Sequence, residues 1–248
     1  MATNKQSAPL TLVVDGVHVH YKAYASGRRA QRGRRLLERD KGVTTVHALK
    51  GISFSAREGE SIGVIGHNGS GKSSLLNAIA GLVAPSKGAV YASSAPAILG
   101  VTSVLIPELS GQKNIELGTF AMGMSRAEAK KAYPEIVEFS GLKEFVHMPM
   151  RTYSAGMSAR LRFSVATARQ HSILMVDEAL AVGDKGFRAR AEERMREMAQ
   201  SASTVFLVSH SMESIRGTCS RVLWIDQGRL KMDGPADHVV SAYEEGQR

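Results

Sequence analysis

The stretch that decides the fold reads Gly66-His67-Asn68-Gly69-Ser70-Gly71-Lys72-Ser73, and it lies between the apolar run 61–65 and a second, longer run that begins at Ser74. This order is that of a strand, a glycine-rich loop and a helix, in which backbone N–H groups and the positive end of the helix dipole face one anion. Lys72 can reach the β- and γ-phosphates of a nucleotide, and the Ser73 hydroxyl can bind Mg²⁺. The stretch therefore predicts a phosphate-binding loop for a nucleotide.

The bulk composition indicates a soluble globular protein of one domain, residues 1–248, in two lobes. No run approaches the roughly 18 to 20 apolar residues of a membrane span. No secretory signal is visible near Met1. The single Cys219 excludes an intrachain disulfide and a cysteine-rich metal cluster, which agrees with a reducing cytoplasm.

The positive charge is concentrated in residues 22–41. This segment holds a net charge of +6 out of the chain's +9. Its cationic residues are Lys22, Arg28, Arg29, Arg32, Arg34, Arg35, Arg39 and Lys41, against Glu38 and Asp40. Such a segment can meet anionic lipid headgroups, nucleic acid phosphates or only solvent, and the charge pattern leaves the three open.

The order of apolar runs predicts an α/β fold. Alternation in residues 10–21 and the run 48–56 predict strands of an N-terminal antiparallel region, and the runs 173–177 and 203–209 are typical of buried parallel strands. Residues 107–165 are mostly helical in pattern. We therefore expect a P-loop NTPase core with a parallel sheet and an inserted helical subdomain.

Smaller signals divide these regions further. Ser125 and Glu128 form a capping-box sequence at a helix start, and Pro134 and Gly141 are expected to break the region after it into short helices. A charged helix is expected over 187–199. A hairpin with a Gln-Gly turn is expected over 222–232.

Three residues at or just after the ends of two expected strands supply the remaining groups that phosphoryl transfer needs. Asp177 ends one strand and supplies a carboxylate for Mg²⁺, and Glu178 follows it where it can orient or deprotonate the attacking water. His210 follows the next strand and is expected to contact the γ-phosphate, because the carboxyl ends of parallel strands meet in one crevice.

A second motif identifies the family. Tyr153-Ser154-Ala155-Gly156-Met157 precedes the helical run 158–163, and Ser154 lies twenty-three residues before Asp177. Here the chain resembles the ATP-binding-cassette (ABC) ATPases, whose signature, usually LSGGQ, occurs at this place. The resemblance implies that the backbone amides of Ser154, Ala155, Gly156 and Met157 bind the γ-phosphate of ATP held by a second copy, so that two copies sandwich the nucleotide. Leu109-Ser110-Gly111-Gln112 looks similar but lies too far before Asp177 and lacks the second glycine.

Further motifs resemble one branch, the ATPase subunits of exporters for O-antigen polysaccharide and teichoic acid. They are the YSxGM signature, Ala179-Leu180-Ala181-Val182-Gly183-Asp184 after Glu178, and Pro107-Glu108-Leu109-Ser110-Gly111 with Asn114. The resemblance implies that Asp184 acts across the dimer and that Tyr21 stacks on adenine. It also places the basic insertion 22–41 near the membrane.

The implied function is ATP hydrolysis that drives a separate polytopic permease exporting a lipid-linked polysaccharide, at the cytoplasmic face of the membrane. The chain departs from the pattern in two ways: no glutamine lies between Tyr91 and Pro107, where Gly100-Val101 stand, and no carbohydrate-binding domain is expected before Arg248. The alternative is a soluble cassette ATPase acting on nucleic acid or ribosomes. A nucleotide-gated scaffold without turnover is disfavoured by Lys72, Glu178 and His210.

Overall fold

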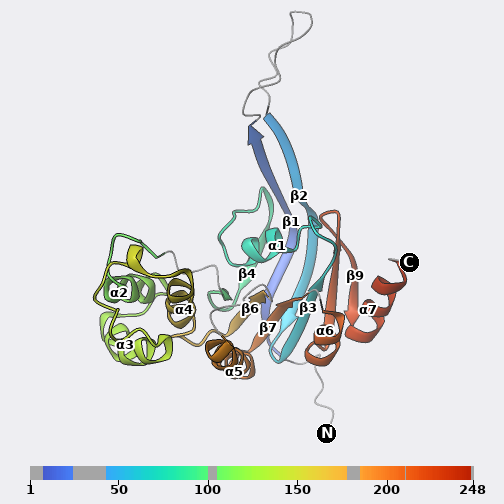
Figure 1. Cartoon of the computed structure of the whole chain (residues 1–248). Helices are drawn as coiled ribbons and strands as arrows, with labels where there is room; N and C mark the ends of the chain where they lie inside the picture. The colour runs from blue at the N-terminus through green and yellow to red at the C-terminus, as the bar shows by residue number, and fades with distance from the viewer. Residues whose placement is uncertain (1–7, 25–42, 100–104, 178–184, 210, 247–248) are drawn as a thin grey trace, which may run out of the picture.

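The computed structural model of the chain describes residues 8–24, 43–99, 105–177, 185–209 and 211–246. Figure 1 shows a sheet-containing body with a separate group of helices beside it. None of the helices in the described ranges is long and apolar enough to cross a membrane.

The body is built on a six-stranded sheet with the order β5-β6-β7-β3-β8-β9. All its neighbours pair in parallel except β9, which returns antiparallel beside β8. The strands are β3 (Glu60–Ile65), β5 (Ala97–Leu99), β6 (Ile173–Asp177), β7 (Thr204–Val208), β8 (Arg221–Asp226) and β9 (Arg229–Pro235). The apolar runs at β3, β6 and β7 are buried on both faces, which confirms the predicted parallel strands.

A three-stranded antiparallel sheet, β2-β1-β4, packs against this body. It consists of β1 (Leu10–Tyr24), β2 (Val43–Arg57) and β4 (Lys87–Ala92). Its apolar face and that of the parallel sheet share one core, in which Phe54 and Phe206 meet edge to face at 6.2 Å. The expected antiparallel region is therefore present and forms the second layer of the body.

Strands β1 and β2 form a long ribbon that extends away from the body (Figure 1). They stay paired as far as Tyr24 and Val43. Residues 22–24, the first of the basic insertion expected over about 22–41, therefore belong to a strand. Residues 25–42, which hold its arginines, lie outside the described residues.

The helices form two groups. Those of the body are α1 (Lys72–Ile79), α5 (Lys185–Ser201), α6 (Met212–Thr218) and α7 (Ala236–Glu245), and those of the lateral group are α2 (Gly111–Ala121), α3 (Arg126–Ser140), the short η2 (Met150–Thr152) and α4 (Ala155–Ala166). The lateral group has a core of its own, formed by Ile115, Ile136, Leu142, Leu161 and Val165 among others. It corresponds to the helical subdomain predicted over 107–165.

One boundary inside this subdomain was predicted wrongly. Pro134 does not divide the region, because α3 continues through it from Arg126 to Ser140. Pro134 is exposed, so water can satisfy the backbone carbonyl that loses its helical partner. The two other signals are confirmed: Ser125 forms the capping box with Glu128, and Gly141 ends α3 with a φ of 65°.

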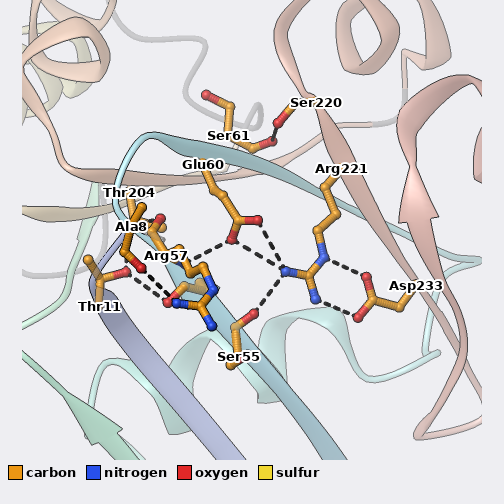
Figure 2. A network of polar contacts seen from close by, with 11 residues as sticks. Ala8, Thr11, Ser55, Arg57, Glu60, Ser61, Thr204, Ser220, Arg221 and Asp233 are labelled. Atoms are coloured by element: carbon orange, nitrogen blue, oxygen red, sulfur yellow. Dashed lines mark hydrogen bonds and ion pairs between the residues drawn. The ribbon is translucent and has the colours of Figure 1, made fainter. Parts of the chain in front are cut away.

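A polar network closes the end of the sheet where the parallel strands begin (Figure 2). The Arg221 guanidinium donates to both carboxylate oxygens of Asp233 at 2.6 Å and to the Ser55 carbonyl at 2.9 Å, and it pairs with Glu60 at 3.3 Å. The hydrogen bonds to Asp233 raise the pKa of Arg221. Beside it the hydroxyls of Thr11 and Thr204 share a hydrogen bond of 2.6 Å. This end is fixed by side chains of both sheets, and the opposite end carries the phosphate-binding loop.

Candidate nucleotide-binding site

The loop 66–71 leaves the carboxyl end of β3 and turns directly into α1. Its shape depends on two glycines. Gly66 has a φ of 148°, and a Cβ there would lie 2.1 Å from the carbonyl oxygen of Ile225. Gly71 has a φ of 113°, and a Cβ there would lie 2.8 Å from the carbonyl oxygen of Ala48. The loop is therefore pressed against neighbouring backbone on two sides, and side chains at these positions would displace it.

Lys72 lies inside the curl of the loop. Its side chain is 8% exposed, and its Nζ donates to the carbonyl oxygens of Gly66 at 2.6 Å and His67 at 3.0 Å. Helix α1 begins at this residue, and Gly71 gives its first turn no side-chain cap. The ammonium group and the first backbone N–H groups of α1 are thus gathered at one end of the helix, the arrangement that binds phosphate.

A cavity of about 370 Å³ opens over this loop. Its lining includes most of the predicted loop together with residues that the sequence did not point to. The lining residues are Val46, His47, Ala48, Lys50, Asn68, Gly69, Ser70, Gly71, Lys72, Ser73, Ser74, Val208, Gln227 and Gly228. The structure thus gathers Asn68 to Ser74 around one cavity, as expected for a nucleotide site.

The β8–β9 turn forms one wall of the cavity. Gln227 and Gly228 adopt φ angles of 47° and 79°, as in a tight hairpin turn. The Gly228 N–H donates to the Ser70 carbonyl, and the Gly228 carbonyl accepts from the Lys50 N–H, both at 2.8 Å. Sequence reasoning found the hairpin but not its position against the loop. The Gln-Gly pair is a local turn signal and carries no information about which distant segment it touches.

Tyr21 lies next to the start of α1. Its hydroxyl donates to the Ser74 hydroxyl at 3.4 Å, and its ring is 40% exposed. Its partner across the β1–β2 ribbon is Val46, which lines the cavity. This position is compatible with a role beside the adenine ring, and stacking on adenine stays a prediction.

The residues expected to carry catalysis are described only in part. Asp177 ends β6 opposite Val208 of β7, and β7 pairs with β3, so the carboxyl ends of these strands lie side by side next to the loop. Val208 itself lines the cavity. The Asp177 side chain and the residues Glu178, Asp184 and His210 lie outside the described part of the chain. The position at Gly100-Val101 lies outside it as well.

The donors expected for Mg²⁺ fit the ion's preferences. Ser73 is exposed at the start of α1 and lines the cavity. The described ranges contain no group of three histidine, cysteine, aspartate or glutamate side chains that could hold a metal ion. Mg²⁺ does not need such a cage, because it takes one or two protein oxygens and keeps water and phosphate ligands. The serine and an aspartate at the end of β6 are suitable oxygen donors for an ion that arrives with the nucleotide.

The signature motif lies at the start of α4 in the lateral subdomain. Ser154 is the N-cap, and its hydroxyl accepts from the Met157 N–H at 3.2 Å. The helix starts at Ala155, three residues earlier than predicted, so Gly156 and Met157 belong to its first turn. Ser154, Ala155 and Gly156 are exposed. No residue of this subdomain is among those lining the cavity over the loop.

The similar motif Leu109-Ser110-Gly111-Gln112 packs against the signature motif. Ser110 caps α2 in the same way, accepting from the Lys113 N–H at 3.2 Å. Gly111 is buried against the signature: a Cβ there would lie 2.4 Å from the Tyr153 hydroxyl. That hydroxyl donates to the Phe145 carbonyl at 2.7 Å, and burial raises the pKa of the Tyr153 phenol. Gly111 is thus needed for the packing of Tyr153.

Asn114, in the first turns of α2, fixes the run Pro107–Ser110 that precedes this helix. It is buried, and its amide donates to the backbone carbonyls of Ile106, Leu109 and Ser110 while its side-chain oxygen accepts from the Ile106 N–H. Its two N–H groups are shared among the three carbonyls, and with the accepted hydrogen bond these contacts fix the loop that carries Ser110. Asn114 and the Pro107–Gly111 run therefore shape the base on which the signature rests.

Comparison with known proteins agrees with this geometry. A family model described as ABC transporter matches residues 49–181. The teichoic acids export ATP-binding protein TagH of Staphylococcus saprophyticus is 40% identical over 200 residues, 81% of this chain and 76% of the relative. The protein of the same name from Staphylococcus haemolyticus is 35% identical over 232 residues, which are 94% of this chain and 87% of the relative. The chain covers only 36% of the longer protein of the same name from Bacillus anthracis, at 39% identity.

Solved structures show the same fold. An ATP-binding subunit of an ABC transporter superposes with a TM-score of 0.68 at 23% identity, covering 94% of this chain and 93% of that one. A dimeric bacterial ABC transporter cassette superposes with a TM-score of 0.65 at 21% identity, covering 91% and 98%. With the phosphate-binding loop, the lateral helical subdomain and the signature at the start of α4 in place, the chain belongs to the ABC transporter family, as an ATP-binding subunit related to the teichoic acid export proteins.

Proposed function

We propose that the chain is the ATP-hydrolysing subunit of an exporter that moves a lipid-linked cell-surface polysaccharide, of the teichoic acid or O-antigen kind, through a separate transmembrane permease. The observation that carries this proposal is the 35% identity over 94% of the chain to a protein named for teichoic acid export. The cavity over the phosphate-binding loop supports the nucleotide part of the proposal. None of the relatives reported above is named for an action on nucleic acid or ribosomes, so the comparisons give the alternative no support.

The active unit is a dimer that holds ATP between two copies. The loop of one copy supplies Lys72 and the N-terminus of α1, and the signature of the other supplies the N-terminus of α4 around Gly156. Two observations support this arrangement: Ser154, Ala155 and Gly156 of the signature are exposed, and the cavity lining includes no residue from their subdomain. A dimeric cassette with the same fold gives it a precedent.

Each residue of the composite site has one role in hydrolysis. Ser73 and Asp177 would hold Mg²⁺, which would neutralise charge on the β- and γ-phosphates. Lys72 leaves the loop carbonyls that it contacts and binds those phosphates. Glu178 orients and deprotonates the attacking water, His210 contacts the γ-phosphate, and Asp184 acts across the dimer. Closure of the dimer then depends on ATP, and its hydrolysis lets the copies separate.

The proposal is tested by isolating the chain from native membranes in a gentle detergent and identifying what comes with it. We expect a polytopic permease, and the complex should hydrolyse ATP. The Glu178→Gln variant should bring the same permease but release little phosphate, because the water is no longer activated. Recovery of ribosomal RNA or DNA in place of a permease would contradict the export function.

The arginines of the basic segment are proposed to lie against anionic lipid headgroups. Each lysine or arginine near such a surface contributes about 1 kcal/mol. Reversing the charges of Arg28, Arg29 and Arg32 should reduce flotation with vesicles that contain anionic lipid. Reversing Lys113, Lys130 and Lys131, which are exposed in the lateral subdomain, makes the same change in charge and should change little. Equal flotation of the two variants would leave the segment without a membrane role.

A further inference from the structure

His67, the second residue of the phosphate-binding loop, has an unusual pair of contacts. Its Nδ1 lies 2.8 Å from the backbone oxygen of Asn68, and its Nε2 lies 2.9 Å from a carboxylate oxygen of Asp226. Asp226 ends β8 at the turn that forms one wall of the cavity. The imidazole therefore joins the loop to this turn by a side-chain contact, next to the backbone hydrogen bond from Gly228 to Ser70.

Both partners of the ring are acceptors. A backbone carbonyl has no proton to donate, and an ionised carboxylate has none either. Both contacts are hydrogen bonds only when both ring nitrogens carry a proton, which is the imidazolium form. A neutral imidazole has one N–H and can keep only one of the two contacts. Loss of the proton therefore releases either the loop carbonyl or the turn.

The backbone of the same residue organises the loop. The His67 carbonyl accepts from the Lys72 ammonium at 3.0 Å and from the Ser70 N–H at 3.1 Å. A change in how His67 is held is thus passed to Lys72, the residue that binds the phosphates. The side chain is half-exposed, so its proton can exchange with solvent.

Charged groups face the pair from four elements. Asp226 on β8 contacts the ring directly. The Lys72 ammonium on α1 donates to the His67 carbonyl, and the Lys231 ammonium on β9 lies 3.9 Å from the second Asp226 oxygen. His47 and Lys50 on β2 line the cavity over the loop. Arg229 on β9 is near the same wall, where it donates to the Lys50 carbonyl. A nucleotide would add several negative charges to this cationic site and so favour the imidazolium.

We propose that His67 and Asp226 form a proton-dependent hydrogen bond that positions the phosphate-binding loop, so that nucleotide binds more tightly when His67 is protonated. His67 is a positioning residue here, acting through the loop and Lys72. The inference rests on the proposed nucleotide-binding function and adds a regulation to it, a dependence of affinity on pH.

The test compares the pH profiles of binding of a fluorescent ADP analogue between pH 5.5 and 8.5. The wild-type affinity should increase about three- to tenfold more on acidification than that of His67→Gln, which keeps a polar side chain but cannot become charged. Protonation of the nucleotide contributes equally to both and cancels. His238→Gln removes an exposed histidine on α7 and should follow the wild type.

The Asp226→Asn variant tests the same hydrogen bond from its other partner. It replaces the carboxylate, which can only accept from Nε2, by an amide that can face the ring with its oxygen or its NH₂ group, so the contact no longer requires a protonated ring. The extra affinity gained on acidification should therefore be smaller than in the wild type. A wild-type profile that coincides with those of both variants would overturn the inference and leave the proposed function intact. Absence of nucleotide binding by the wild type at every pH would instead refute the nucleotide-binding function itself.

Discussion

Gly66 and Gly156 stand in the two motifs that are proposed to contact nucleotide, and their surroundings differ. A Cβ at Gly66 would lie 2.1 Å from the Ile225 carbonyl oxygen, at a φ of 148°. Among the described residues, a Cβ at Gly156 would meet only the Ser154 hydroxyl, at 3.9 Å, in ordinary helical backbone. The chain's own packing requires the first glycine and leaves the second unexplained. The open space at Gly156 leaves room for another molecule, and the γ-phosphate of ATP held by a second copy is the one proposed above.

The N-termini of the helices beside these glycines also differ, in whether a side chain caps them. The first turn of α1 has Gly71 as its N-cap and no side-chain cap, whereas the first turn of α4 is capped by the Ser154 hydroxyl. The phosphate-binding half thus leaves backbone N–H groups for a ligand, and the signature half already satisfies one of its own. The loop half can bind nucleotide in a single copy, and the signature half is expected to contribute only after dimer closure.

The largest effect is expected from removing the charge inside the loop. Lys72→Met should lower ATP hydrolysis by at least about a hundredfold, because the β- and γ-phosphates lose their cation in a site shielded from water. Phosphate release by the purified protein measures it. Lys113→Met removes an exposed lysine that pairs with Glu116 and serves as the control. Wild-type turnover by Lys72→Met would place the nucleotide elsewhere.

Mixing two inactive variants tests whether the halves come from different copies. Gly156→Glu places a carboxylate where the partner's γ-phosphate is expected, so it should abolish hydrolysis, as Lys72→Met does. In a dimer of one copy of each, one composite site carries both defects and the other carries neither. An equal mixture should regain up to about a quarter of the wild-type rate, because about half of the dimers are mixed and each has one intact site. A mixture as inactive as its components would argue for sites within single copies.

A smaller effect distinguishes the glycines themselves. Gly66→Ala should lower the free energy of unfolding by about 2 kcal/mol or more, because the added Cβ displaces the loop from the Ile225 carbonyl. Gly156→Ala should leave it unchanged or raise it by about 0.5 to 1 kcal/mol through helix propensity. Urea unfolding measures both. Strong destabilisation by Gly156→Ala would mean that its own chain requires this glycine.

The sequence predicted what depends on local pattern. The strand, loop and helix around Lys72, the parallel strands, the helical subdomain and the Gln227-Gly228 hairpin are all confirmed. Pro134 was misjudged because its effect depends on which face of α3 it occupies, a tertiary property. The cavity wall that includes His47 and the β8–β9 turn was missed for a related reason: no spacing in the chain reports that His47 lines this cavity or that His67 contacts Asp226.

The smallest effect separates the two serine caps. Ser154 and Ser110 each accept one backbone N–H at 3.2 Å at the start of a helix in the same subdomain. Each serine-to-alanine change should therefore lower the free energy of unfolding by a similar amount, about 1 kcal/mol. Only Ser154→Ala should also weaken the ATP-dependent dimer of the Glu178→Gln variant, as measured by size-exclusion chromatography with ATP. Because the two caps match in geometry, a difference in dimerisation at equal stability isolates the contact with the second copy. Equal weakening by Ser110→Ala would mean that the subdomain's stability, and not the signature, controls closure.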